Sequence, residues 1–118
     1  MPSIHVFSNA TAASVDTSSA LQALSKSLAL ALDRSEQVVM VQLSLDQAML
    51  FAGSDTLCAF VHVRSIGRID RELNPKTAQV VTAAVTEALA VPADRIFINL
   101  NDIASANWGF HGTTIDRL

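Results

Sequence analysis

The second residue of the chain is the strongest candidate for chemistry. Pro2 directly precedes the segment 3–8, in which apolar residues alternate with polar ones. Removal of Met1 would make the Pro2 nitrogen a secondary amine instead of an amide. An α-amino group titrates at about 7.7–8.0 in water, and burial disfavours its protonated form. Such an amine is suited to act as a general base near neutral pH. Taken alone, however, a proline before a strand is more often only structural.

Other residue types that do chemistry lack a supporting pattern. His5, His62 and His111 have no metal-ligand spacing, so no metal site is predicted. The glycines are isolated and form no phosphate-binding loop, and no Gly-x-Ser-x-Gly motif is present. Cys58 is the only cysteine and lies in an apolar run. It is therefore predicted to be a buried, unreactive thiol, and it has no partner within the chain for a disulfide.

The first half of the chain predicts one β-α-β unit. Alternating apolar residues favour a strand over residues 3–8. Leucines at helical spacing predict a helix over residues 17–32, with Asp16, Thr17 and Ser18 available as N-caps. A run rich in β-forming residues follows at 38–43.

The second half predicts the same unit again. A strand is expected over residues 57–66, and Asn74-Pro75 is a strong helix start, with Asn74 as the cap. That helix should stop before Pro92, and residues 95–100 predict the closing strand. Two such units imply an α/β fold, a four-stranded mixed sheet with two helices on one face. The polar stretch 107–118 has only short strand character.

Composition limits the classes of function. A chain of 118 residues predicts a single domain, residues 1–118. Its net charge of −3 and lack of a basic cluster argue against nucleic-acid binding. No apolar run is long enough to span a membrane, and no signal peptide is apparent, so we expect a cytoplasmic protein. Half of the residues are hydrophobic, which favours burial of one sheet face by self-association.

Five motifs in order along the chain resemble one family. They are Met-Pro at 1–2, Asp-Gln-Ala-Met at 46–49, Ser-Ile-Gly-Arg-Ile at 65–69, Asp-Arg-Ile-Phe-Ile-Asn at 94–99 and Ala-Ser-Ala-Asn-Trp-Gly at 104–109. Together they resemble the macrophage migration inhibitory factor family of the tautomerase superfamily over essentially the whole chain. The resemblance implies a homotrimer with sites between subunits, a catalytic N-terminal proline and no cofactor.

The resemblance also assigns roles to individual residues. Pro2 matches the catalytic base, and the Ile66 N–H, beside Ser65, would hold the substrate carboxylate. Arg34 takes the place of the family's usual lysine, although a cation at a helix C-terminus is favourable without any ligand. The remaining pocket residues implied are Phe97, in place of a tyrosine, and Asn99, both from the neighbouring subunit, with Trp108, Phe110 and Ile115 at the apolar rim.

The implied reaction is keto–enol tautomerisation of phenylpyruvate-like 2-keto acids. Two alternatives stay open. One is a superfamily hydratase or dehalogenase, which Arg34 in place of lysine keeps in consideration. The other is a non-catalytic, cytokine-like signalling protein, although no feature of the sequence marks a receptor-binding surface. A Cys-x-x-Cys motif found in some members is absent, because Val61 stands three places after Cys58.

Overall fold

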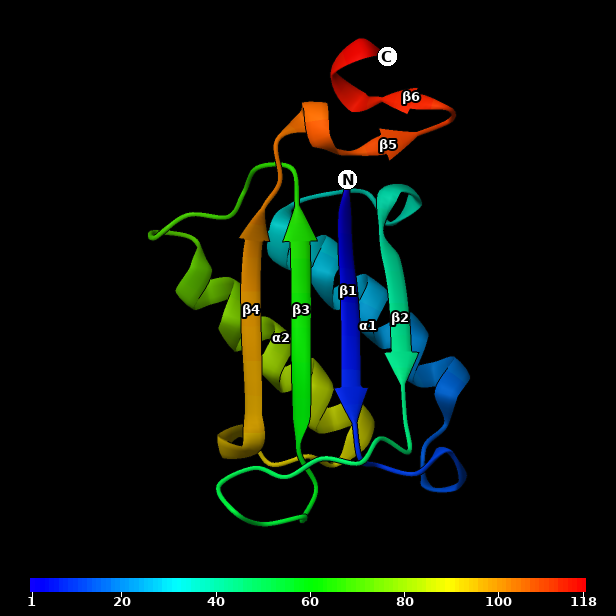
Figure 1. Ribbon diagram of the computed structural model, residues 1–118, viewed down its shortest axis with the longest axis vertical. Coiled ribbons are helices and arrows are strands. Elements are labelled where there is room, and N and C mark those ends of the chain that lie inside the picture. Colours follow the sequence, from blue (N-terminus) through cyan, green and yellow to red (C-terminus); the bar gives the residue numbers. More distant parts are fainter.

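Four strands form one mixed sheet in the computed structural model, which describes residues 1–118 (Figure 1). The strands are β1 (Pro2–Ser8), β2 (Met40–Ser44), β3 (Ala59–Ser65) and β4 (Ile96–Asp102). Their order across the sheet is β2-β1-β3-β4. β1 is parallel to β2 and antiparallel to β3, and β3 is parallel to β4. The predicted duplicated β-α-β architecture is therefore confirmed.

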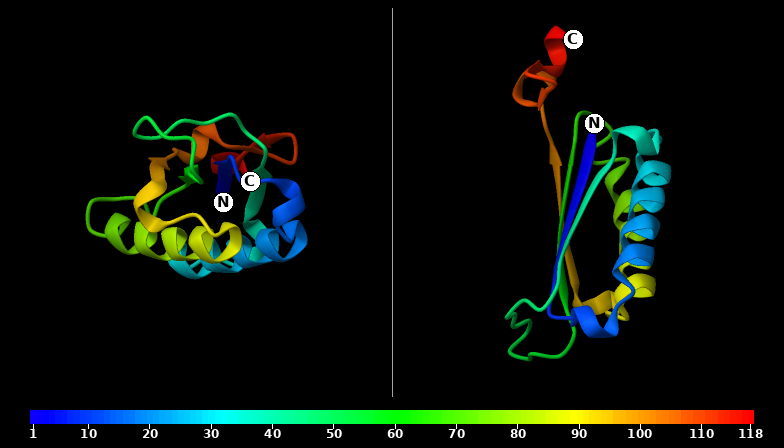
Figure 2. Two further views of the ribbon diagram at one scale, coloured as in Figure 1. Left: turned by 90° about the horizontal axis from the view of Figure 1, so that it is seen from below. Right: turned by 90° about the vertical axis from the view of Figure 1, so that its right-hand side faces the viewer.

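Two helices cover the same face of this sheet, as the right-hand view of Figure 2 shows. They are α1 (Thr17–Leu32) and α2 (Asn74–Leu89). The Asp16 side chain caps α1 by accepting a hydrogen bond from the Ser19 N–H at 3.1 Å. Neither helix is long and apolar enough to cross a membrane.

The predicted cap of α2 was wrong by one residue. Asn74 is the first residue of the helix, and Leu73 occupies the cap position without a side-chain bond. Asp70 takes over the capping role, because its Oδ1 accepts hydrogen bonds from the N–H groups of Glu72 and Leu73. The Asn74 side chain in turn accepts from the Asp70 N–H.

The hydrophobic core lies between the helices and the sheet. Alternate side chains of β1 and β3, including Ile4, Val6, Val61 and Val63, are buried there against both helices. The predicted leucine stripe of α1 supplies Leu24, Leu28 and Leu32, whereas Leu21 at its edge is 37% exposed. Cys58 is buried and unpaired, as predicted.

The other face of the sheet carries no helix (Figure 2). Met40 and Phe97 on this face are 71% and 62% exposed, and Phe60 is half-buried. His5 and Phe7 stack there with their ring centroids 3.8 Å apart. A broad apolar and aromatic surface is thus left uncovered within one chain.

A C-terminal hairpin lies beyond the end of the sheet at which the N-terminus is found (Figure 1). It consists of β5 (Gly109–Phe110) and β6 (Thr113–Thr114), joined by His111 and Gly112. Both linking residues have positive φ angles, 54° and 81°, which is the requirement of a type I′ hairpin turn. Short 3-10 helices complete the chain at Ala12–Ser14, Glu36–Val38, Ala93–Arg95, Ser105–Asn107 and Ile115–Arg117.

One arginine fixes the long loop between β2 and β3. The Arg95 guanidinium donates hydrogen bonds of 2.9–3.2 Å to four carbonyl oxygens of this loop. The carbonyl groups belong to Phe51, Ser54, Thr56 and Leu57. The guanidinium carbon also lies 5.1 Å from the centroid of the Phe51 ring, a cation–π distance.

Candidate active site

Pro2 occupies the first position of β1, next to the centre of the sheet. Its ring is fully buried, on the same face as Ile4 and Val6, and its backbone pairs with Ser65 of β3. A proline is tolerated at this position because the first residue of a strand need not donate to the ladder. The ring is thereby held in one orientation by the core below it.

The nitrogen that precedes Pro2 lies in surroundings that disfavour positive charge. Burial, and then the nearby charge of Arg34, lower the pKa of the Met1 amine from its usual 8.0. The Met1 carbonyl oxygen accepts a hydrogen bond from the Ile66 N–H at 3.3 Å. Met1 therefore engages the backbone donor to which the resemblance assigns the substrate carboxylate.

Arg34 reaches this region from the end of α1. The helix closes with Asp33 in the left-handed conformation, and the Arg34 N–H donates to the Ala29 carbonyl at 2.9 Å. The side chain turns away from the helix, and its Nη2 donates to the Ile66 carbonyl oxygen at 3.3 Å. The guanidinium thus lies beside the 65–67 turn, and its other N–H groups are available to a ligand.

Ser65 holds that turn in place. Its side chain is fully buried and its hydroxyl donates to the Gly67 carbonyl at 2.8 Å. The Gly67 N–H in turn donates to Asp102 Oδ1 at 3.0 Å. Gly67 has a φ of 76°, and a Cβ at this position would lie 3.8 Å from Arg34 Nη2. The hydroxyl of Ser65 is therefore already engaged, and the residue supports the turn from below.

A pocket of about 400 Å³ opens at Pro2. The start of β1, the segment 37–40 and the C-terminal hairpin form its walls, with Trp108 and Phe110 among the lining side chains. The sequence did not single out Gln37, Val38, Val39 and Met40. These residues could have been found from the parallel pairing of β1 and β2, because that pairing places the beginnings of both strands at the same end of the sheet.

Ile115 lies next to this wall without lining the pocket. Its N–H donates to the Trp108 carbonyl oxygen at 2.9 Å, and its side chain is half-buried. The contact fixes the terminal turn against Trp108, which lines the pocket. Trp108, Phe110 and Ile115 are thus brought together by the hairpin.

Two predicted site residues lie elsewhere in the same chain. Phe97 of β4 pairs with Phe60 of β3, which in turn pairs with Phe7 of β1. Phe7 lies five positions along β1 from Pro2. At about 3.4 Å per residue this separation is about 17 Å. Phe97 instead packs on Phe51, with ring centroids 4.6 Å apart. Both rings line a separate pocket of about 390 Å³ that contains no part of the Pro2 site. Asn99 is exposed on the uncovered face of the sheet.

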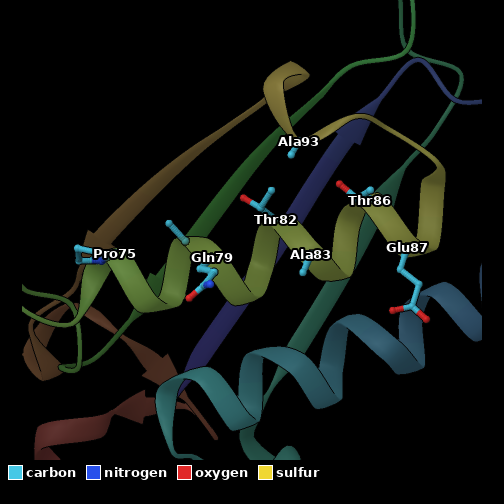
Figure 3. Close-up of a pocket in the computed structure, with 8 residues that line it drawn as sticks. Pro75, Gln79, Thr82, Ala83, Thr86, Glu87 and Ala93 are labelled. Atoms are coloured by element: carbon cyan, nitrogen blue, oxygen red, sulfur yellow. The ribbon is translucent and has the colours of Figure 1, made fainter.

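A hollow of about 580 Å³ lies along α2, and Figure 3 draws the residues that line it. Gln79, Thr82 and Thr86 are among its lining residues, and Glu87 is the only ionisable residue among them. No predicted site residue lines this hollow. The pocket at Pro2 is therefore the better candidate for chemistry, because it alone combines an amine, an adjacent cation and apolar walls.

Comparison with known proteins shows which family the chain is similar to. The family model described as macrophage migration inhibitory factor (MIF) matches residues 1–116. The macrophage migration inhibitory factor of Mus musculus is 32% identical over 114 residues, which is 97% of this chain and 98% of that protein. That of Meriones unguiculatus is 34% identical over 94 residues, covering 80% and 82% respectively.

Solved structures extend the similarity to the fold. The macrophage migration inhibitory factor homologue from Prochlorococcus marinus superposes with a TM-score of 0.89 at 33% identity, covering 96% of this chain and 98% of that one. The factor from Trichinella spiralis gives a TM-score of 0.91 at 26% identity, over 95% and 98% of the two chains.

Proposed function

The chain belongs to the macrophage migration inhibitory factor family, and on that premise we propose that it is a keto–enol tautomerase of phenylpyruvate-like 2-keto acids. The observation that carries the proposal is the environment of the N-terminal end of β1. A buried proline ring there lines an apolar pocket, and burial and Arg34 both lower the pKa of the adjacent amine.

The proposed base is the Pro2 nitrogen in a chain from which Met1 has been removed. The same burial and the same guanidinium would then act on the secondary amine and favour its neutral, proton-accepting form. The amine takes a proton from the carbon beside the substrate carbonyl, and the electron pair of that C–H bond moves to make the enolate. Protonation of the oxygen completes the enol. No cofactor is required, because the substrate carbonyl itself accepts the electron pair.

We assign the substrate carboxylate to Arg34 and to the Ile66 N–H. Ile66 and Arg34 do not line the pocket within the single chain that carries Met1. The Ile66 N–H donates to the Met1 carbonyl, so removal of Met1 would free this backbone donor next to Pro2. A guanidinium and an N–H close together suit a planar carboxylate. Trp108 and Phe110 would contact the aryl or alkyl group, and Ser65 would keep the 65–67 turn in position.

We further propose a homotrimer in which Phe97 and Asn99 of a neighbouring subunit complete the pocket. Within one chain Phe97 is too far from Pro2 to touch the same small substrate, and Asn99 lies on the uncovered face, whereas the Pro2 ring faces the helices. The uncovered face of the sheet, with exposed Met40 and Phe97, supports burial against further copies of the chain. Light scattering should give three times the chain mass, and a monomer would contradict this assembly.

Enol–keto conversion of phenylpyruvate, followed in the ultraviolet, tests the proposal. The protein must first be shown by intact mass to lack Met1. Pro2→Gly should lower kcat/KM by about 100- to 10,000-fold, the usual contribution of a general base. A matched control keeps Pro2 but retains an N-terminal extension, which makes its nitrogen an amide, and it should be equally impaired. Full activity in either protein would refute Pro2 as the base.

A further inference from the structure

A second cavity, of about 310 Å³, adjoins the Pro2 pocket. Ser3, Trp108 and Gly109 line both cavities, so the two share one wall. The remaining lining residues of the second cavity are Arg64, Ile103 and Asn107. A ligand bound at Pro2 could therefore extend past Trp108 into this space.

The strand register places Arg64 next to the proposed catalytic centre. Arg64 pairs with Ser3, and the next residue, Ser65, pairs with Pro2. Because side chains alternate along a strand, Arg64 lies on the face of the sheet away from the helices, whereas Pro2 faces them. Arg34 approaches the same end of β1 from α1, on the helix side. Two guanidinium groups thus flank the start of β1 from opposite faces.

The charge of Arg64 has no counter-ion in the chain. The single ion pair joins Arg68 to Asp33, and the Arg64 side chain makes no hydrogen bond. On this face of the sheet the ionisable side chains are His5, His62 and Arg64, with no carboxylate among them. The position therefore favours an anion from outside the chain.

The cavity also offers the right neighbours for an anion. Ser3, Asn107 and Trp108 each carry a side-chain N–H or O–H, and no lining residue carries a negative charge. An arginine presents several donors in a planar array that fits a carboxylate. Ile103 and the Trp108 ring would contact the carbon chain of a ligand that carries a carboxylate at each end.

We propose that this second cavity binds a distal carboxylate, so that the substrate of the Pro2 site is a 2-keto acid with two carboxylates. The inference rests on the proposed tautomerase function. The carboxylate next to the carbonyl lies at Arg34 and Ile66, the reacting carbon at Pro2, and the far carboxylate at Arg64. The reaction is unchanged: one C–H bond breaks, one O–H bond forms, and Pro2 carries the proton between them.

A binding experiment tests the anion site without relying on catalysis. Trp108 is the only tryptophan of the chain and lines both cavities, so its fluorescence reports on either. The Met1-free protein is titrated with glutarate, which carries two carboxylates, and with butyrate, which carries one. We expect glutarate to bind about 10- to 100-fold more tightly, the range of one charged hydrogen-bonded contact.

Substitution of Arg64 should remove this preference. Arg64→Gln should bring the Kd of glutarate to within about twofold of that of butyrate, and Arg64→Lys, which keeps the charge, should retain part of the difference. Arg71→Gln is the matched control, since Arg71 is an exposed arginine that lines neither cavity. Equal affinities in the unsubstituted protein, or a preference that survives Arg64→Gln, would overturn the inference.

Kinetics separate this inference from the tautomerase proposal. Arg64→Gln should raise KM for enol–keto conversion of oxaloacetate by about 10-fold and leave KM for phenylpyruvate unchanged. An equal loss with both substrates would contradict a distal-carboxylate site. Arg64-dependent glutarate binding without turnover of either substrate would keep the anion site and refute the tautomerase. Turnover of phenylpyruvate with no Arg64-dependent binding of glutarate would keep the tautomerase proposal and refute the anion site.

Discussion

The terminal amine of Met1, which precedes β1, lies near the Arg34 guanidinium, and that positive charge makes the amine less basic. Arg34 ranks after burial among the causes that lower the pKa of the terminal amine. Its side chain is held by the Ile66 carbonyl, so the charge stays near the amine before any substrate arrives. In the proposed mechanism, Arg34 would thus both lower the pKa of the base and bind the substrate carboxylate.

Replacement of Arg34 should therefore move the pH profile as well as weaken binding. A nearby cation disfavours the protonated amine, so Arg34→Gln raises the amine pKa. More of the base is then protonated at neutral pH, and the acidic limb of kcat/KM shifts to higher pH. Arg34→Lys keeps the charge and should keep the limb in place. A profile unmoved by Arg34→Gln would show that the charge of Arg34 does not act on the base.

Residue identity predicted part of this site, and geometry supplied the rest. Pro2 could be proposed from its residue type, whereas Arg34 and Ile66 could be proposed only from the family resemblance. Arg64 could not, because an arginine inside a strand looks like any polar interruption until its register with Ser3 is known. Likewise, the engaged hydroxyl of Ser65 depends on the turn at Gly67, which residue type alone does not specify.

At the scale of the elements, the spacing of apolar residues was enough to predict most of the helices and strands. Both helices and all four long strands form where spacing predicted them, because one face of each must be buried. The start of β2 was less clear: the predicted run began at 38, whereas Glu36–Val38 forms a 3-10 turn and the strand begins at Met40. The hairpin turn at His111 escaped notice, since only its positive φ reveals the turn type.

The buried stripe of α1 provides a matched pair for stability. Leu28 is fully buried, and Leu30, two residues further along the same helix, is 79% exposed. Leu28→Ala should lower the free energy of unfolding by about 2–5 kcal/mol, because it leaves a cavity in the core. Leu30→Ala should change it by less than about 0.5 kcal/mol in a monomer. Urea unfolding measures both, and equal effects would mean that the core is misplaced.

At the scale of the whole molecule, the candidate site is divided between two ends of the sheet. Pro2 and Arg34 lie at one end, and Phe97 lies near the other with Phe51. Sequence reasoning could not establish this division, because it follows from the strand register and not from residue type.

Mixed oligomers can show whether neighbouring subunits share a site. Pro2→Gly and Phe97→Ala should each be impaired alone. If one subunit supplies Pro2 and its neighbour supplies Phe97, random mixing of the two variants in equal amounts restores about a quarter of the sites. The test is the phenylpyruvate assay after joint unfolding and refolding of the two proteins. Activity no higher than the average of the separate variants would mean that each site is built within one chain.

The four carbonyl contacts of Arg95 have a consequence for how such an assembly would form. A loop of this length loses conformational entropy whenever it becomes ordered. Here Arg95 fixes it within the single chain, so Phe51 and the Phe97 ring above it are in place before any second copy arrives. The surface offered to a partner is therefore rigid in advance, and association need not include the cost of ordering it.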